Sequence, residues 1–216
     1  MLRKIKELAK STPLYAFVKN RKQKAVLTKW ESDPARKGPL PHILKQFTVK
    51  DYAYKYNCGI LVETGTFEGD MVKACLPSFS KVYSIELDKS LFEKAVARFK
   101  NSTNVKILNG DSGQKLPEIL AEVTTPCVFW LDGHYSAGIT AKGNLETPIA
   151  LEIESIFNHR VADHVILIDD ARCFDGTHDY PQLNKFIEEL HRRKPNIRVE
   201  VYNDIIRITP DQPVIH

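Results

Sequence analysis

The sequence predicts an α/β domain with a mostly parallel sheet of seven strands, helices on both faces and an antiparallel hairpin at the C-terminal end. From about residue 57 onward, apolar runs of strand length alternate with longer amphipathic segments, the pattern of parallel strands joined by helices. Near the end of the chain, two β-rich runs are separated only by Asn203-Asp204, a dipeptide typical of a tight hairpin turn.

Each expected strand is a short run rich in Val, Ile, Leu or aromatic residues. The strands are expected at 60–64, 81–86, 105–109, 127–131, 165–168, 198–202 and 205–209. Each expected helix repeats apolar residues at three- or four-residue spacing. The helices are expected at 42–56, 70–76, 90–99, 113–122, 148–158 and 182–193. This order predicts a Rossmann-like sheet that ends in an antiparallel hairpin.

The composition is that of an ordinary globular protein, with 216 residues, 43% hydrophobic and 27% charged. We expect a basic helical arm and linker at 1–40, followed by one domain at 41–216. No apolar run approaches the roughly 20 residues of a membrane helix, and Met1–Lys6 lacks the apolar core of a signal peptide. The four cysteines are scattered without C-x-x-C spacing, which favours reduced thiols in a cytoplasmic protein.

The N-terminal arm carries most of the positive charge. Residues 1–30 contain nine Lys or Arg and only one acid, Glu7, whereas the whole chain has a net charge of +4. A basic amphipathic helix is suited to the anionic inner face of a membrane or to a partner, including a second copy in a homodimer. No nucleic-acid-binding motif accompanies the charge, so no specific nucleic-acid partner is expected.

The most informative motif is the segment 63–69, where an apolar strand ends in Glu63 and breaks into a turn containing Gly65 and Gly69. About twenty residues later a second strand ends in Glu86, which is placed to accept hydrogen bonds from a ribose diol. Dinucleotide sites use G-x-G-x-x-G, but here Phe67 stands at the middle position and two carboxylates flank the turn. These features favour the cationic S-adenosylmethionine (SAM), and an NAD-dependent oxidoreductase stays as the alternative.

Five successive strands each deliver a carboxylate at or just past their C-terminal end. In open α/β sheets, ligands bind beyond the carboxyl ends of the strands. Acids converging there repel each other unless cations are bound. The acids are Glu63, Glu86, Asp111, Asp132 and the pair Asp169-Asp170.

Over roughly residues 57–209 the chain resembles class I SAM-dependent methyltransferases. Within these it is similar to metal-dependent O-methyltransferases of the catechol and caffeoyl-CoA type and to sugar O-methyltransferases of macrolide and surface-polysaccharide pathways. The segments 63–69, 109–112, 129–134 and 168–170 resemble the family's successive motifs. The resemblance implies cofactor binding by Glu63, Gly65, Thr66, Phe67, Gly69, Glu86, Asp111, Ser112 and Asp132.

The resemblance also implies a divalent-metal site formed by Asp132, Asp169 and Asp170. Three oxygen ligands suit Mg²⁺ or Mn²⁺, which would orient a substrate hydroxyl and lower its pKa. The chain departs from the catechol type because no lysine closely follows Asp132, and His134 is the expected base.

The expected function is therefore SAM-dependent O-methylation of a small hydroxylated molecule such as a sugar or saccharide precursor. The other alternative is a methyltransferase-like domain that binds a ligand without turnover.

Overall fold

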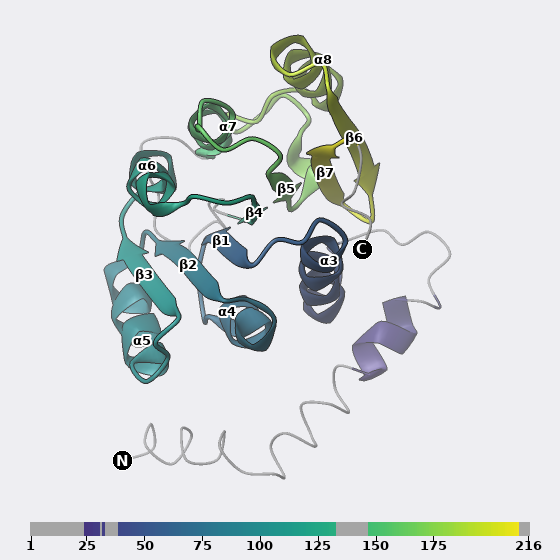
Figure 1. Cartoon of the computed structure of the whole chain (residues 1–216). Coiled ribbons are helices and arrows are strands. Elements are labelled where there is room, and N and C mark those ends of the chain that lie inside the picture. Colours follow the sequence, from purple (N-terminus) through teal and green to yellow (C-terminus); the bar gives the residue numbers. More distant parts are fainter. Residues whose placement is uncertain (1–23, 31, 33–38, 133–146, 212–216) are drawn as a thin grey trace. The chain divides into compact units, whose positions relative to one another are not determined.

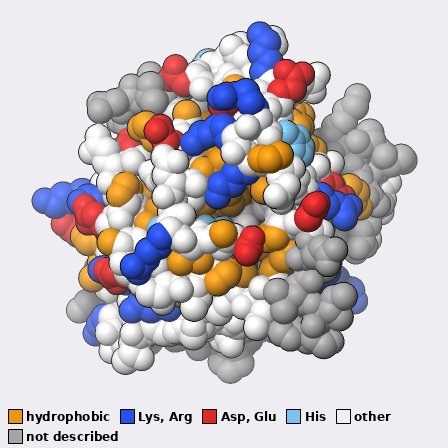
Figure 2. Space-filling model, turned by 45° about the horizontal axis from the view of Figure 1, so that its top comes forward, with side chains coloured by type: hydrophobic (Ala, Val, Ile, Leu, Met, Phe, Trp, Pro, Cys, Tyr) orange, Lys and Arg blue, Asp and Glu red, His pale blue; other side chains and the backbone are white. Residues whose placement is uncertain are grey.

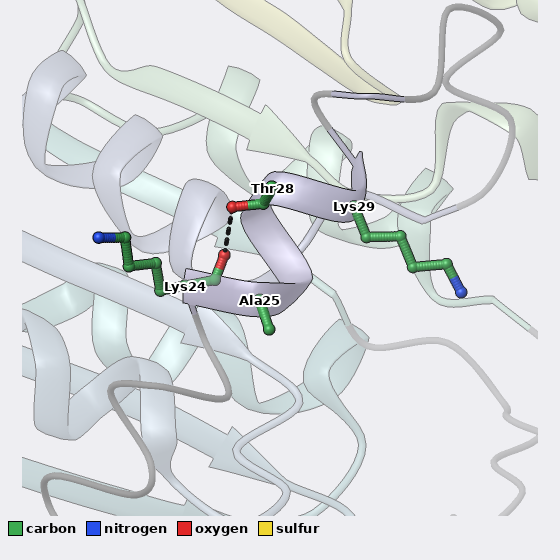
Figure 3. Close-up of a pocket in the computed structure, with 4 residues that line it drawn as sticks. All are labelled: Lys24, Ala25, Thr28 and Lys29. Carbon is green, nitrogen blue, oxygen red and sulfur yellow. Dashed lines mark hydrogen bonds between the residues drawn. The ribbon is translucent and has the colours of Figure 1, made fainter.

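The computed structural model describes residues 24–30, 32, 39–132 and 147–211. The chain forms two compact units, Met1–Lys45 and Gln46–His216. In the first unit the residues 24–30 are helical, and the Thr28 hydroxyl donates a hydrogen bond to the carbonyl oxygen of Lys24 (3.0 Å; Figure 3). The predicted arm therefore lies mostly outside the described residues. No described helix combines the length and the apolar character needed to cross a membrane.

The second unit contains one seven-stranded sheet in the order β3-β2-β1-β4-β5-β7-β6 (Figure 1). Strands β1 to β5 pair in parallel, and β7 is antiparallel to both β5 and β6. The strands are β1 Ile60–Thr64, β2 Lys81–Glu86, β3 Val105–Asn109, β4 Cys127–Leu131, β5 Val165–Ile168, β6 Ile197–Tyr202 and β7 Ile205–Pro210. The predicted Rossmann-like sheet with its C-terminal antiparallel hairpin is confirmed.

Helices cover both faces of this sheet, with α4 and α5 on one face and α6, α7 and α8 on the other (Figure 1). The helices are α3 His42–Lys55, α4 Asp70–Cys75, α5 Lys89–Phe99, α6 Ser112–Glu122, α7 Ile149–Phe157 and α8 Leu183–Arg193. Two short 3₁₀ turns, η1 (Leu76–Ser78) and η2 (Ala171–Cys173), were not predicted, because three residues are too few to show a periodic pattern.

The central strands are apolar on both faces because helices cover both. On β4 all five residues are buried, and they alternate between the two layers of core. Phe129 packs with the residues of α6, α7 and α8, whereas its neighbour Trp130 points to the opposite face. This double burial explains why the strands read as continuous apolar runs in the sequence.

The β6–β7 hairpin turns at Asn203-Asp204, as predicted. Both residues have positive φ, 49° and 60°, which is the backbone conformation of a type I′ turn. Asn and Asp tolerate this left-handed conformation better than most residues, so the dipeptide fits the turn.

Two histidines near the N-terminal end of β4 form a hydrogen-bonded chain. The backbone N–H of Cys127 donates to Nδ1 of buried His164 (3.1 Å). The His164 proton must therefore sit on Nε2, which donates to Nδ1 of His159 (2.9 Å). His159 Nε2–H then donates to the carbonyl oxygen of Leu120 (2.9 Å). The chain is complete only when both rings are neutral, and burial lowers the pKa of His164 to about 4.

This chain predicts a pH-dependent contribution to stability. The folded-state pKa of His164 lies below the ordinary value of 6.5. The contribution of neutral His164 to the free energy of unfolding is therefore complete above pH 6.5 and is lost as the pH falls toward 4. We expect wild type to lose up to about 3 kcal/mol of unfolding free energy through this group. His164→Asn, whose amide can accept from Cys127, should show a shallower pH dependence in urea unfolding. A His191→Asn control, at an exposed site on α8, should keep the wild-type slope, and identical slopes in all three proteins would contradict the assignment.

Candidate functional site

The candidate site lies at the carboxyl ends of β1, β2, β4 and β5. The chain runs from β1 through β2 to β3 toward one edge of the sheet, and from β4 to β5 toward the other, so the strand order reverses between β1 and β4. This reversal is the position at which open α/β sheets bind ligands. Asp132 directly follows β4, and its backbone N–H donates to the carbonyl oxygen of Thr64 (3.1 Å). Asp169 follows β5 and donates in the same way to Leu131 (3.0 Å). Backbone pairing therefore holds the strand-end residues side by side.

A loop with unusual backbone conformation follows β1. Gly65, Phe67 and Gly69 have positive φ values of 89°, 47° and 72°. Glycine adopts such values freely, but a bulky residue such as Phe67 does so only under strain. The Phe67 side chain is 47% exposed, so burial of its ring contributes little to holding it there. This strain at an exposed position marks the loop as a candidate binding element.

Glu86 holds this loop from the end of β2. Its Oε2 accepts a hydrogen bond from the backbone N–H of Phe67 (2.7 Å), and its Oε1 accepts one from Asp88 (2.9 Å). Burial raises the pKa of Glu86, and these backbone donors oppose that rise. Each carboxylate oxygen has a second lone pair, so Glu86 retains the capacity to accept from a ribose diol.

A buried hydrogen-bonded chain lies beneath the loop. The Ser84 hydroxyl donates to Oε2 of Glu63 (2.5 Å) and lies 2.6 Å from the hydroxyl of Thr66. Burial raises the pKa of Glu63 to about 8, and the charges of Asp132 and Glu86 add to the rise. Glu63 and Thr66 were predicted as cofactor residues, but the Thr66 hydroxyl is directed to Ser84. Sequence reasoning missed Ser84 because a serine inside an apolar strand gives no motif signal.

A second buried carboxyl lies where α6 begins. The Ser112 and Thr64 hydroxyls hydrogen-bond to Glu152 of α7, whose pKa burial raises to about 7. Among the described residues, Oε1 of Glu152 has no hydrogen-bond partner. Asp111 precedes α6 and raises the pKa of Glu152 through its charge. Ser112 was predicted to bind cofactor, yet its hydroxyl hydrogen-bonds to Glu152. The burial of Glu152 depends on which face of α7 packs against the sheet.

Asp132, Asp169 and Asp170 form a cluster that can hold a metal ion. Each offers one carboxylate oxygen, and these oxygens all lie within 4.8 Å of one another. Asp169 and Asp170 are buried, and Oδ1 of Asp169 accepts a hydrogen bond from the backbone N–H of Asp170 (2.9 Å). An all-oxygen set of this kind fits Mg²⁺ or Mn²⁺. The structure thus brings together the three residues that the sequence predicted as metal ligands.

The remaining candidates lie partly outside the described residues. His134, predicted as the base, belongs to the undescribed segment 133–146. The segment 172–180, which follows the pair Asp169-Asp170 in the sequence, is described. Its Tyr180 packs edge-on against Phe174 (centroids 5.1 Å apart) and hydrogen-bonds to Thr147. Burial raises the pKa of Tyr180, and the charges of Asp170 and Asp132 raise it further.

Two other surface features do not form the site. A hollow in the first unit is lined by Lys24, Ala25, Thr28 and Lys29, all from one short helical segment (Figure 3). Two lysines that point in opposite directions do not converge on a ligand. Figure 2 shows a face on which apolar side chains gather near the middle and charges of both signs surround them. Its coloured residues form no broad basic surface of the kind that nucleic-acid binding uses.

Comparisons with known proteins place the fold. No protein-family model matches the sequence, and no curated protein matches it. Among solved structures, the SAH-bound methyltransferase PaMTH1 from Podospora anserina is similar, with a TM-score of 0.57, 16% identity, and coverage of 93% of this chain and 96% of that chain.

Two bacterial O-methyltransferases are also similar. TomG from Streptomyces achromogenes, in complex with SAM, has a TM-score of 0.57 and 15% identity, with 78% of this chain and 80% of that chain covered. An O-methyltransferase from Bacillus cereus, in complex with SAH, has a TM-score of 0.56 and 15% identity, with 88% and 89% covered. The chain therefore has the fold of class I SAM-dependent methyltransferases.

Because Glu63 is buried, its ionisation should lower the free energy of unfolding of the protein without a ligand. Its folded pKa of about 8 exceeds the ordinary 4.5, so the stabilising contribution of its proton is full below pH 4.5 and is lost as the pH rises through 8. Glu63→Gln keeps an acceptor for Ser84 without the charge. We expect it to raise the unfolding free energy by about 2 kcal/mol at pH 9 and by much less at pH 5.

Urea unfolding followed by the fluorescence of buried Trp130 would measure this difference. Glu93→Gln, at an exposed position of α5, is the matched control and should show no such pH-dependent gain. A Glu63→Gln protein no more stable than wild type at pH 9 would argue against a buried, costly charge.

Because Phe67 has a positive φ, glycine at this position should give a more stable protein than alanine, the reverse of the order found in helices. Phe67→Gly should be more stable than Phe67→Ala by about 1 kcal/mol, because only glycine adopts this conformation without strain. At the exposed helical position Val96 the order should reverse, with Val96→Ala more stable than Val96→Gly by a similar amount. Thermal unfolding of the four variants tests the assignment, and the same order at both positions would refute it.

Proposed function

We propose that the protein is a SAM-dependent O-methyltransferase, assisted by a divalent metal ion, that acts on a small hydroxylated molecule. The observation that carries this proposal is the adjacency of two sets of groups at one strand-order reversal. The strained loop held by Glu86 is suited to an adenosyl cofactor, and Asp132, Asp169 and Asp170 lie beside it with their oxygens within 4.8 Å of one another. The similar solved structures support the cofactor choice, since they contain SAM or SAH.

In this proposal the cofactor is held by the ends of β1 and β2. The Glu86 carboxylate accepts hydrogen bonds from the ribose diol while it keeps the Phe67 backbone in place. Glu63 lies beneath the loop, and a cationic ligand there would favour its ionised form. The carboxylates oppose NAD, since a pyrophosphate prefers glycine-rich backbone and positive groups.

The three aspartates would hold the metal ion, and their all-oxygen donor set fits it. When bound, the ion lowers the pKa of a substrate hydroxyl and fixes its orientation. Methyl transfer would form a bond between the substrate oxygen and the methyl carbon of SAM and break the bond from that carbon to sulfur, which would leave SAH. We assign the departing proton to His134, two residues after Asp132, because imidazole titrates near neutral pH.

The proposed substrate is a sugar or saccharide precursor. Support comes from the segment 172–180, which combines exposed polar residues with the ring pair Phe174–Tyr180. Tyr180 is protonated at neutral pH, because even the ordinary tyrosine pKa of 10 lies well above 7, so it can donate a hydrogen bond to a substrate oxygen. Contact of the basic arm with a membrane or with a second copy, and a cytoplasmic location, are proposals from the sequence alone.

Asp169→Asn tests the proposed metal-assisted mechanism. The variant should weaken Mg²⁺ binding at least about tenfold and slow methyl transfer at least about a hundredfold, because one of three anionic ligands is lost. Its affinity for SAM should stay within about threefold of wild type. Calorimetry would measure the affinities, and transfer of a labelled methyl group to a panel of hydroxylated acceptors would measure the rate.

Asp163→Asn is the matched control, because Asp163 is an exposed aspartate outside the cluster. It should leave all three quantities unchanged. Undiminished methyl transfer by the Asp169→Asn variant would overturn the metal-assisted mechanism, and no transfer by wild type to any acceptor would count against the proposed substrates.

A further inference from the structure

Arg172 lies between two carboxylates, one of which belongs to the aspartate cluster that could hold a metal ion. Its Nη1 donates to Oδ1 of Asp170 (2.7 Å) and also to Oδ2 of Asp204. The Asp170 side chain is 5% exposed, whereas that of Arg172 is 43% exposed. A guanidinium is charged at every physiological pH. One of the three predicted metal ligands is therefore already paired with a permanent cation.

Asp204 holds the arginine by more than charge. Its Oδ1 accepts a hydrogen bond from the backbone N–H of Arg172 (2.9 Å), and its carbonyl oxygen accepts one from Ala171 (2.9 Å). Asp204 belongs to the type I′ turn of the β6–β7 hairpin, which fixes its backbone. The hairpin thus anchors the turn that follows Asp170 and offers Arg172 a second anionic partner.

Arg172 and a divalent metal ion would both pair with the carboxylate of Asp170. A buried carboxylate needs a counter-charge, and without a metal ion the guanidinium supplies it. A divalent ion that binds Asp170 must share that carboxylate with Arg172. The arginine side chain is half exposed and has several rotatable bonds, so it can keep Asp204 while it yields Asp170.

We propose that Arg172 is a resident counter-ion that competes with the divalent metal ion for Asp170, and that Asp204 sets the strength of this competition by drawing Arg172 away. Arg172 and Asp204 are then positioning residues that tune metal affinity without binding the metal themselves. The inference rests on the proposed metal site, and it predicts opposite effects for two neighbouring substitutions.

This inference is tested by titrating the full chain with Mg²⁺ and with Mn²⁺ and measuring the affinities by calorimetry. Arg172→Gln removes the competing cation and should tighten metal binding about tenfold. Asp204→Asn keeps the acceptor for the Arg172 N–H and tolerates the left-handed turn, but it leaves Asp170 as the charged partner of the arginine. It should weaken binding about tenfold.

Two further variants serve as controls. Arg192→Gln makes the same charge change at an exposed ion pair on α8 and should leave the affinity unchanged. Arg172→Lys keeps the charge and should stay closer to wild type than Arg172→Gln does. Thermal unfolding in EDTA identifies any variant that fails to fold, and the metal-induced rise in melting temperature gives a second measure of affinity.

The outcomes separate this inference from the proposed function. If wild type binds metal and both substitutions weaken binding or leave it unchanged, Arg172 only supports the turn and the inference is wrong, while the metal site stands. Binding by Arg172→Gln but not by wild type would support strong competition. If neither protein binds Mg²⁺ or Mn²⁺, the metal assignment fails and the inference fails with it.

Discussion

Carboxylates gathered at one edge of a parallel sheet repel each other, and the arrangement around them offsets this repulsion. Parallel pairing of β1, β4 and β5 brings Asp132 and Asp169 to the same edge because the strands run in the same direction. Protons and one guanidinium provide the compensation that the described residues show. Glu63 has a pKa of about 8, and Asp170 is paired with Arg172. A cationic ligand that pairs with either carboxylate must displace the proton or the guanidinium that compensates it.

The cofactor side and the metal side of the candidate site depend on the same backbone. The Thr64 carbonyl and hydroxyl oxygens both accept from the Asp132 N–H, at 3.1 and 3.3 Å, and the same hydroxyl hydrogen-bonds to buried Glu152. The loop after Thr64 is held in turn by Glu86. A change in the position of β1 would therefore disturb both halves of the candidate site.

Most of the fold was predictable because the strands are apolar on both faces and the connections contain clear helical patterns. The grouping of the aspartates was predictable for a related reason, since Asp132 and Asp169 directly follow strands whose common direction was evident. Glu152 was not predictable as a site residue, because its burial depends on how α7 packs on the sheet. The pair Arg172 and Asp204 was also missed, because residues 32 positions apart meet only through the antiparallel packing of β7 on β5.

The most direct test of the central claim is a calorimetric titration of the full chain with SAM, repeated with NADH. The account predicts micromolar binding of SAM, similar binding of SAH and no measurable binding of NADH, with the SAM affinity reduced in Glu86→Gln. Binding of NADH in place of SAM would contradict the account, and so would the absence of any SAM binding by the folded protein.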